Sequence, residues 1–418
     1  MPPLERNEQV VLDLLAGEPN GLTRTELRQR SHLSKPTIQG IVHALRRAEL
    51  ITRVRDPRVE NGDAPTGRPA ERWVLARQAG LVMGLDLGHG HAFGAVADRS
   101  GSVLGELEEN RNLDVDRIGA PALGIAVDLL AQALKNNGAS ETDVHAVGVG
   151  IPAAIDDQGR VLFTDYLPTW ATVDIPGELH ALLSERFPRM RLAPKNIRVE
   201  NDANLGALGE GLNGAASGQR DYLYLKASTG IGMGLILDGR IHRGVDGAAG
   251  EFGHVSVSPM ADELIKSEIR RPVAECPRCR KVNCLENTAS CGAIVRQLRA
   301  TDPAYPADLT IQDVIARARD DVRNHPLCMQ AIVEAGIRIG YTLVDVLRIY
   351  APECVVVGGL LAEAKDILTK QINEAIEGAK GMPATKIVIV ESDRIIRSEV
   401  EGAIALALQA KTYRSTRQ

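Results

Sequence analysis

The 418-residue sequence has few aromatic side chains, 3% of the total, and only six cysteines. Six cysteines in a chain of this length are too few to build a disulfide framework. The sequence also lacks a run of about 20 apolar residues, and its start, MPPLER, has no apolar signal core, which predicts a cytoplasmic protein without a membrane partner. A hydrophobic content of 44% and a charged content of 25% exclude disorder, and the length predicts two or three domains.

Glycine, by contrast, is abundant, with 40 residues, which indicates many tight loops. The net charge of −5 is unevenly distributed along the chain. Residues 1–78 contain 13 Lys and Arg against 10 Asp and Glu, whereas the rest of the chain contains 36 against 44. A basic N-terminal part on an acidic body favours a head that binds nucleic acid.

The first 78 residues have the pattern of a winged helix-turn-helix domain. Residues 4–15 repeat apolar side chains at helical spacing, and a second helix is predicted from the capping-box pair Thr23 and Glu26. Ser34 is the expected cap of a third helix. This third helix has a single apolar stripe, formed by Ile38, Ile41, Val42 and Leu45.

The same segment predicts how the head contacts DNA. Alternating side chains at residues 50–54 and 72–75 predict two wing strands, and Arg68 in the loop between them is expected to enter the minor groove. The polar face of the third helix can reach base edges or phosphates through Ser34, Lys35, Thr37, Gln39, His43 and Arg46. A small helical module that binds protein is the alternative, because a bare helix-turn-helix pattern is not specific.

Two glycine-bearing turns in the rest of the chain are candidates for phosphate-binding loops. In the first, an apolar strand ends in Asp86 and Gly88 before a returning strand, so that backbone N–H groups can bind phosphate and the acid can face a metal ion. An ordinary hairpin has the same pattern. The second is the glycine-rich run Ser228–Gly234, and Asp202 follows another strand where a helix begins, at a junction that favours ligand sites.

The run Ser228–Gly234, followed by Asp238-Gly239-Arg240 and by the segment from Gly244 to His254, closely resembles the ROK family (repressor, open reading frame, kinase) of sugar kinases and sugar-responsive repressors. Three more segments resemble family motifs: the catalytic segment at 200–204, the end of the zinc motif at 284–286 and the adenosine-side glycine pair at 355–359. The resemblance covers about residues 79–410, and the head resembles that of the repressor branch.

The resemblance implies an α/β fold, the two-lobed actin-like ATPase (sugar kinase) architecture, preceded by an all-α/winged helix-turn-helix domain. The implied boundaries are 1–78 for the DNA-binding domain and 79–418 for the sugar-kinase-like domain. Within the latter, lobe one is expected at about 79–200 together with a C-terminal helix at about 398–412, and lobe two at about 201–397.

The resemblance also implies the site residues. Asp202 would take the proton of a sugar hydroxyl if kinase activity is retained. The implied sugar-binding residues are Asn201, Asp202, Glu251, His254 and Glu286. The implied phosphate- and nucleotide-binding residues are Asp86, Gly88, Thr229, Gly230, Gly232, Gly358 and Gly359.

A cluster of three cysteines completes the implied sites. With His254 it would form a closed set of four ligands for a structural zinc ion: His254, Cys276, Cys279 and Cys284. The first two cysteines are separated by two residues where the family has one, so Cys276 departs from the pattern. Three unligated cysteines are the alternative.

The sequence departs from the kinase pattern at the first phosphate loop, where His89 and Gly90 stand in the places of a glycine and a threonine. A side chain at the glycine position obstructs the approach of phosphate, so we expect weak or absent use of ATP and Mg²⁺. Ala153 and Tyr166 also depart from family positions, and the second puts the sugar's identity in doubt.

Two functions remain open. The favoured one is a sugar-responsive regulator of carbohydrate-metabolism genes, most naturally a repressor, and the other is an ATP-dependent, glucokinase-like sugar kinase with a DNA-binding head. The expected partners are a palindromic double-stranded operator, a sugar or sugar-phosphate effector and further copies of the chain in a homodimer or homotetramer.

Overall fold

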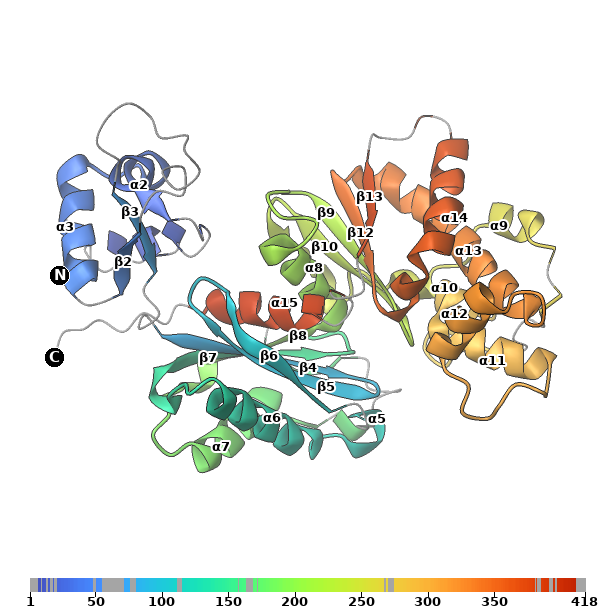
Figure 1. The fold of residues 1–418 in the computed structure, drawn as a ribbon, viewed down its shortest axis with the longest axis horizontal. Helices are drawn as coiled ribbons and strands as arrows, with labels where there is room; N and C mark the ends of the chain where they lie inside the picture. The colour runs from blue at the N-terminus through green and yellow to red at the C-terminus, as the bar shows by residue number, and fades with distance from the viewer. Residues whose placement is uncertain are drawn as a thin grey trace.

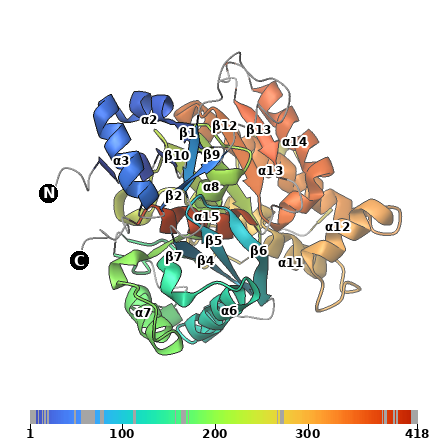
Figure 2. The same ribbon diagram turned by 60° about the vertical axis from the view of Figure 1, so that its left-hand side comes forward.

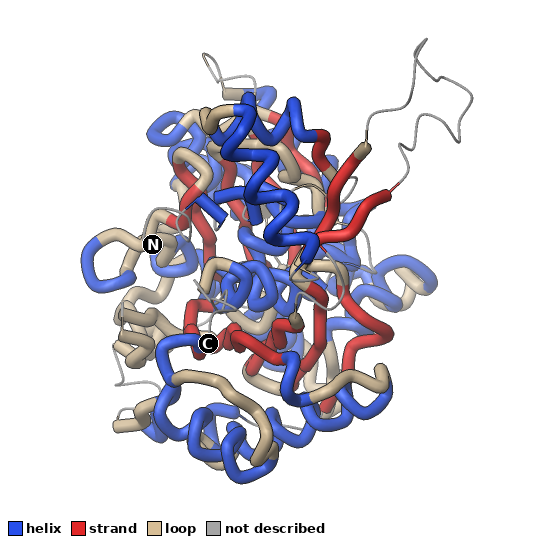
Figure 3. Tube along the Cα trace, turned by 90° about the vertical axis from the view of Figure 1, so that its left-hand side faces the viewer, coloured by secondary structure: helices blue, strands red, loops and turns tan. Residues whose placement is uncertain are grey.

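The computed structural model describes residues 7–8, 10–12, 14–15, 18, 21–47, 50–54, 71–75, 80–110, 115–156, 158–162, 168–170, 172–266, 268–269, 274–379, 381, 385–390, 394 and 397–410. These residues form a small N-terminal head and two larger lobes, each lobe built on a five-stranded sheet (Figure 1). Figure 3 views the molecule from the side of the head. The predicted loop residue Arg68 and the family position Tyr166 lie outside the described residues.

The head has the predicted helices and wing strands. After helical residues between positions 7 and 15, its elements are β1 (Leu22–Thr23), α2 (Arg24–Ser31), α3 (Lys35–Arg47), β2 (Ile51–Val54) and β3 (Arg72–Leu75). The capping box of α2 is confirmed, because the Thr23 hydroxyl accepts from the Glu26 N–H and the Glu26 carboxylate accepts from the Thr23 N–H. The strand β1 was not predicted, and it pairs with β3 to give the sheet order β1-β3-β2.

The first lobe contains a sheet with the strand order β6-β5-β4-β7-β8. Its strands are β4 (Leu81–Gly88), β5 (His91–Asp98), β6 (Val103–Asn110), β7 (Val144–Ile151) and β8 (Ile197–Asn201). The strands β4, β5 and β6 are antiparallel neighbours, whereas β7 and β8 run parallel to β4. Three helices accompany this sheet: α5 (Val115–Ile118), α6 (Ala122–Asn136) and α7 (Ile175–Arg186).

The second lobe repeats this topology with the order β11-β10-β9-β12-β13. Its strands are β9 (Tyr222–Ala227), β10 (Ile231–Leu237), β11 (Arg240–Ile241), β12 (Cys354–Gly358) and β13 (Lys386–Ile389). Its helices are α9 (Pro259–Leu264), α10 (Leu285–Ala289), α11 (Cys291–Thr301), α12 (Ile311–Asp320), α13 (Pro326–Tyr350) and α14 (Lys365–Gly378). The duplicated arrangement confirms the predicted two-lobed α/β fold.

Two helices lie between the sheets, α8 (Asp202–Asn213) and α15 (Arg397–Leu408) (Figures 1 and 2). They approach each other closely because both have glycine at the crossing. A Cβ on Gly209 would clash with the backbone of Ser398, and a Cβ on Gly402 would clash with the backbone of Leu205. Several of the abundant glycines therefore serve close helix packing as well as tight turns.

Among the described residues, one helix is long and apolar enough by length and composition to span a membrane. It is α13, and 67% of its apolar window is buried inside the protein. Its side chains Ile332, Ile339 and Leu343 belong to the core of the second lobe. The burial of this helix is that of a core helix.

Candidate functional site

A cavity of about 670 Å³ lies between the two lobes. The predicted site residues that line it are Gly88, Asn201, Asp202, Thr229, Gly230, Gly232, Glu251 and Glu286. Asp86, His254, Gly358 and Gly359 are not among its lining residues, although each lies next to one that is. The cavity also includes residues that the sequence analysis did not single out, namely His91, Lys226, Arg278, Thr310, Gln312 and Glu363.

Asp202 is held in place by the start of α8. The strand β8 ends at Asn201, whose side-chain oxygen accepts from the N–H groups of Ala203 and Asn204 and so caps the helix. The Asn201 amide also donates to the carbonyl of Ala153 at 3.1 Å. The helix junction predicted for Asp202 is therefore present, and much of the hydrogen-bonding capacity of Asn201 is used to form it.

The Asp202 carboxylate is paired with a lysine that the sequence analysis missed. The Lys226 ammonium donates to Asp202 Oδ2 at 3.0 Å and lies 3.2 Å from Glu399 Oε1 on α15. Burial lowers the pKa of Lys226, but Asp202 and Glu399 together raise it well above its usual value. The other Asp202 oxygen accepts from the Ala203 N–H at 2.8 Å, so both oxygens are engaged.

The sequence did contain a signal for this lysine. Lys226 is the one charged residue in the strand YLYLKA, whose other positions are buried. A charge in a buried strand requires a partner, because an isolated charge is costly to remove from water. The partners Asp202 and Glu399 are distant in the sequence, and no local motif identifies them.

Asp86 has a partner from its own hairpin. Its Oδ2 lies 3.0 Å from His91 Nε2, and the carboxyl is buried. Burial raises the pKa of Asp86, but Lys226 and His91 outweigh that effect and hold the pKa below its usual value. A Cβ on Gly88 would clash with the His91 ring, so the turn is closely packed on its cavity side.

The glycine-rich turn between β9 and β10 is covered by a carboxylate. The Ile231 N–H donates to Glu286 Oε2 at 3.0 Å, and a Cβ on Gly230 would lie 2.8 Å from the same oxygen. The Glu286 carboxylate therefore accepts a hydrogen bond from a backbone N–H that a phosphate-binding turn would donate to its ligand.

The predicted adenosine-side glycines have a packing reason in this fold. Gly359 has a φ of 82°, and a Cβ there would clash with the Ala227 backbone. A Cβ on Gly358 would clash with the Tyr224 hydroxyl. The next residue, Leu360, lines the cavity. These glycines allow β12 to approach β9 whether or not a nucleotide binds.

The sugar-binding candidates of the second lobe converge around one imidazole. His254 Nε2 lies 3.6 Å from Glu251 Oε2 and 3.9 Å from Glu286 Oε1, and it has no hydrogen-bond partner within the described part of the chain. Burial lowers the pKa of His254, so the ring is neutral near pH 7. Two carboxylates and an unpaired ring nitrogen can together satisfy several sugar hydroxyls.

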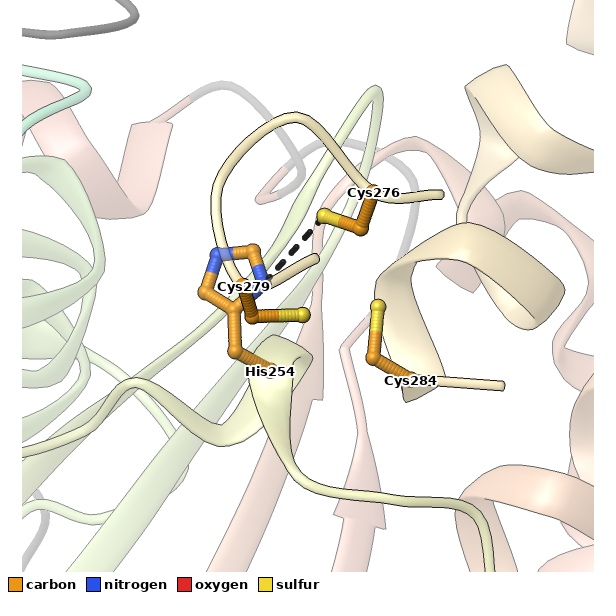
Figure 4. A group of neighbouring side chains, drawn as sticks. All are labelled: His254, Cys276, Cys279 and Cys284. Atoms are coloured by element: carbon orange, nitrogen blue, oxygen red, sulfur yellow. Dashed lines mark hydrogen bonds between the residues drawn. The ribbon is translucent and has the colours of Figure 1, made fainter. Parts of the chain in front are cut away.

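The four predicted metal ligands also converge, as Figure 4 shows. Their ligand atoms all lie within 4.8 Å of one another, and His254 Nδ1 is 3.7 Å from Cys276 Sγ. A tetrahedral zinc site with Zn–S bonds of about 2.3 Å needs ligand separations of roughly 3.8 Å, so these residues fit the ion. The two-residue spacing after Cys276 does not prevent its participation.

The two predicted roles of His254 use different ring nitrogens. Nδ1 faces the cysteines, and Nε2 faces the carboxylates of Glu251 and Glu286. Burial raises the pKa of the Cys284 thiol to about 12, and a bound metal would replace its proton. The cluster could thus hold the His254 ring in position for a ligand on its other side.

The third helix of the head presents its predicted DNA face. Ser34, Lys35, Gln39, His43 and Arg46 are exposed, and Thr37 is half-buried. The Ser34 hydroxyl accepts from the Thr37 N–H at 3.3 Å, which confirms its role as a cap. The opposite stripe of α3 is buried in the head.

The chain is similar to known repressors and kinases. A family model described as the ROK family matches residues 82–410, and one described as the MarR family matches residues 4–60. The chain is 24% identical over 374 residues to the xylose repressor of Bacillus spizizenii, which covers 88% of this chain and 86% of that repressor.

Two solved structures share the fold. One is a ROK family transcriptional regulator, a homologue of the E. coli MLC protein, with a TM-score of 0.70 and 23% identity over 97% of this chain and 96% of that one. The other is a ROK family glucokinase from Streptomyces griseus in complex with glucose and AMPPNP, with a TM-score of 0.61 and 24% identity over 79% of this chain and 100% of that one. Because the ROK model matches most of the sequence, from residue 82 to residue 410, the chain belongs to the ROK family.

Proposed function

We propose that the protein is a DNA-binding transcriptional repressor that releases its operator when a sugar binds between the two lobes. Its similarity to a xylose repressor supports this function. The observation that carries the proposal is the engagement of the Asp202 carboxylate by Lys226 in a cavity lined by polar groups. Such a cavity is suited to binding a sugar without transferring a phosphoryl group to it.

The head would bind the major groove through α3. Its exposed Lys35 and Arg46 can contact phosphates, and Gln39 can form hydrogen bonds with base edges. A homodimer would place two such helices on the two halves of a palindromic operator. The loop that carries Arg68 would add a minor-groove contact.

Release of the operator would follow from the linkage between lobe closure and head position. The cavity is lined from lobe one by Gly88 and from lobe two by Glu251 and Glu286, so a sugar that contacts both sides favours the closed form. Residues 76–80 alone separate the last strand of the head from β4. Movement of lobe one would therefore change the spacing of the two heads in a dimer and lower operator affinity.

A zinc ion held by His254, Cys276, Cys279 and Cys284 would have a structural role. These four groups complete a tetrahedral set and leave no position for substrate. A bound metal would hold together the two segments that carry His254 and Glu286. Its expected contribution is to the affinity for sugar, because the two residues would otherwise lose their fixed geometry.

An ATP-dependent sugar kinase is the second candidate, and the observation that favours it is the position of Asp202 in the cavity of a kinase-like fold. Against it stand His89 in the first turn and the two bonds that engage Asp202. A phosphorylation assay with Mg²⁺·ATP and a panel of sugars separates the candidates. If the wild type phosphorylated a sugar and Asp202→Asn abolished this activity, the kinase would replace the repressor as the proposed function.

The repressor proposal is tested with the full chain and DNA fragments from upstream of the genes adjacent to its own. Fluorescence anisotropy should detect a bound fragment, and one sugar of the panel should lower its affinity at least about tenfold. Lys35→Ala should weaken binding to all fragments and reduce the salt dependence. If no sugar alters the affinity of the protein for a DNA fragment that it binds, the proposed release of the operator by sugar is wrong.

A further inference from the structure

Lys226 lies where acidic groups from three elements converge. Besides Asp202 on α8 and Glu399 on α15, the buried carboxyl of Asp86 on β4 is close enough to interact with it electrostatically. Burial raises the pKa of Glu399, and the Tyr224 hydroxyl donates to it at 3.1 Å. Even with Glu399 protonated, the cluster has one cation for two carboxylates.

The wall of the cavity has the same excess of acid. Four of its lining residues are acidic, Asp202, Glu251, Glu286 and Glu363, and two carry a full positive charge, Lys226 and Arg278; two histidines, His89 and His91, line it as well. Both charged cations already have acidic neighbours, since Lys226 contacts Asp202 and Glu399, and Arg278 lies 4.0 Å from Glu251. His91 lies 3.0 Å from the Asp86 carboxylate. A phosphate that entered the cavity would have to compete with carboxylates of this chain for each cation.

Two other groups that could receive a phosphate or its metal ion are also engaged. The Ile231 N–H of the glycine-rich turn donates to Glu286, and the Asp86 carboxyl is bonded to His91. Side chains of the protein itself thus engage three groups that a phosphate or its metal ion could contact. These are Asp86 beside the first turn, the Ile231 N–H of the glycine-rich turn, and Asp202, the candidate catalytic base. An uncharged polyol finds donors and acceptors there, whereas an anion meets carboxylates.

We propose that the cleft selects its effector by charge: it binds an uncharged sugar and rejects the phosphate ester of that sugar, and Lys226 is a positioning residue that acts as an internal counter-ion for Asp202. This inference rests on the proposed function, because it concerns the sugar that would release the operator. It narrows the effector class from sugar or sugar phosphate to the unphosphorylated sugar.

Isothermal titration calorimetry on the full chain tests the charge preference. The probes are D-glucose, D-xylose and N-acetyl-D-glucosamine, each compared with its 6- or 5-phosphate ester. The sugar that binds should have an affinity at least about tenfold higher than that of its ester, because like charges across an interface are strongly unfavourable. An ester that binds as tightly as its parent sugar, or more tightly, overturns the inference and leaves the sugar-responsive function intact.

Absence of binding by every sugar and every ester, together with an unchanged affinity for DNA, would instead contradict the proposed function and the inference with it. The role of Lys226 is tested separately with Lys226→Met, which removes the charge and keeps most of the length of the side chain. The variant should lose about tenfold in sugar affinity, because Asp202 is left without its counter-ion.

The variant Lys226→Arg provides the control for charge. It keeps a cation beside Asp202, so it should retain more of the sugar affinity than Lys226→Met does if charge balance is what Lys226 supplies. A Lys226→Arg variant as weak as Lys226→Met would assign the loss to packing and overturn the counter-ion role. A Lys226→Met variant with unchanged affinity would overturn it as well.

Discussion

The two lobes have the same strand order, yet their equivalent hairpins face the cleft with different chemistry. In lobe one, β4 and β5 meet at His89 and Gly90, and the hairpin carries the buried acid Asp86. In lobe two, β9 and β10 meet at the glycine-rich turn, and the equivalent strand carries the half-buried cation Lys226. A duplicated fold has thus placed a buried acid in one lobe and a cation in the other, close enough to interact electrostatically.

The comparison teaches that the fold and the chemistry of its loops are separable. Both hairpins have the topology of a phosphate-binding site, but each is engaged by side chains of this chain, Asp86 by His91 and the glycine-rich turn by Glu286. The architecture that ROK regulators share with ROK kinases is therefore compatible with binding a sugar as a signal, without catalysis.

The largest expected effect comes from removing the cation on the second hairpin. Lys226→Met should lower the free energy of unfolding by about 3–5 kcal/mol, because buried carboxyls lose their partner. Chemical denaturation measures this loss. The matched control is Lys386→Met on β13 of the same sheet, where the lysine is exposed and the change should stay within about 0.5 kcal/mol. If the two substitutions lowered the free energy of unfolding equally, Lys226 would not be a stabilising partner of the buried carboxyls.

The second effect concerns the support of Glu286 by the cysteine cluster. Cys284→Ser should abolish stoichiometric zinc, measured by elemental analysis, and weaken sugar binding by about 10- to 100-fold. Cys328→Ser is the control, because this buried thiol lies in the core of the same lobe, away from the cluster. Unchanged zinc content in Cys284→Ser would contradict the ligand assignment.

The third effect is a pH dependence that belongs to the first hairpin. The folded pKa of Asp86 is below the ordinary value, so its carboxylate stabilises the fold above about pH 4, and this contribution is lost as the pH falls through the folded pKa. Asp86→Asn should therefore be destabilised near pH 7 by about 1–2 kcal/mol, and the difference from the wild type should shrink below pH 4. If the difference in stability between the wild type and Asp86→Asn instead grew on acidification, the lowered pKa assigned to Asp86 would be wrong.

The smallest effect compares the two turns directly. Gly230→Ala places a methyl group 2.8 Å from the Glu286 carboxylate and disturbs its bond to Ile231, which should cost about 1 kcal/mol. Gly90→Ala meets no atom within 4 Å and should change the free energy of unfolding by less than about 0.5 kcal/mol. If Gly90→Ala proves the more damaging, the free space that the structure shows around Gly90 is wrong.

Local patterns predicted much of the fold. The caps at Thr23 and Ser34 and the junction at Asp202 depend on neighbours within three residues, so a short window of sequence contains their cause. The strand β1 was missed because two residues carry no periodicity, and it is defined only by its pairing with β3.

The contacts of the site were less predictable because they join distant positions. Lys226 meets Glu399 across 173 residues, and Glu286 meets the Ile231 N–H across 55. The family resemblance supplied the list of candidate groups, but not these pairings. It also drew attention to His89 as the departure from kinases, whereas the structure adds the engagement of Asp202 by Lys226.

The central claim is that the cleft responds to an unphosphorylated sugar without phosphoryl transfer. The most direct measurement is the anisotropy of labelled operator DNA bound to the full chain, with sugar added in the absence and presence of Mg²⁺·ATP while ADP is monitored. The account predicts that the sugar alone releases the DNA, that Mg²⁺·ATP leaves the titration unchanged and that ADP does not accumulate. Release that requires Mg²⁺·ATP, accompanied by sugar-dependent ADP formation, would contradict it.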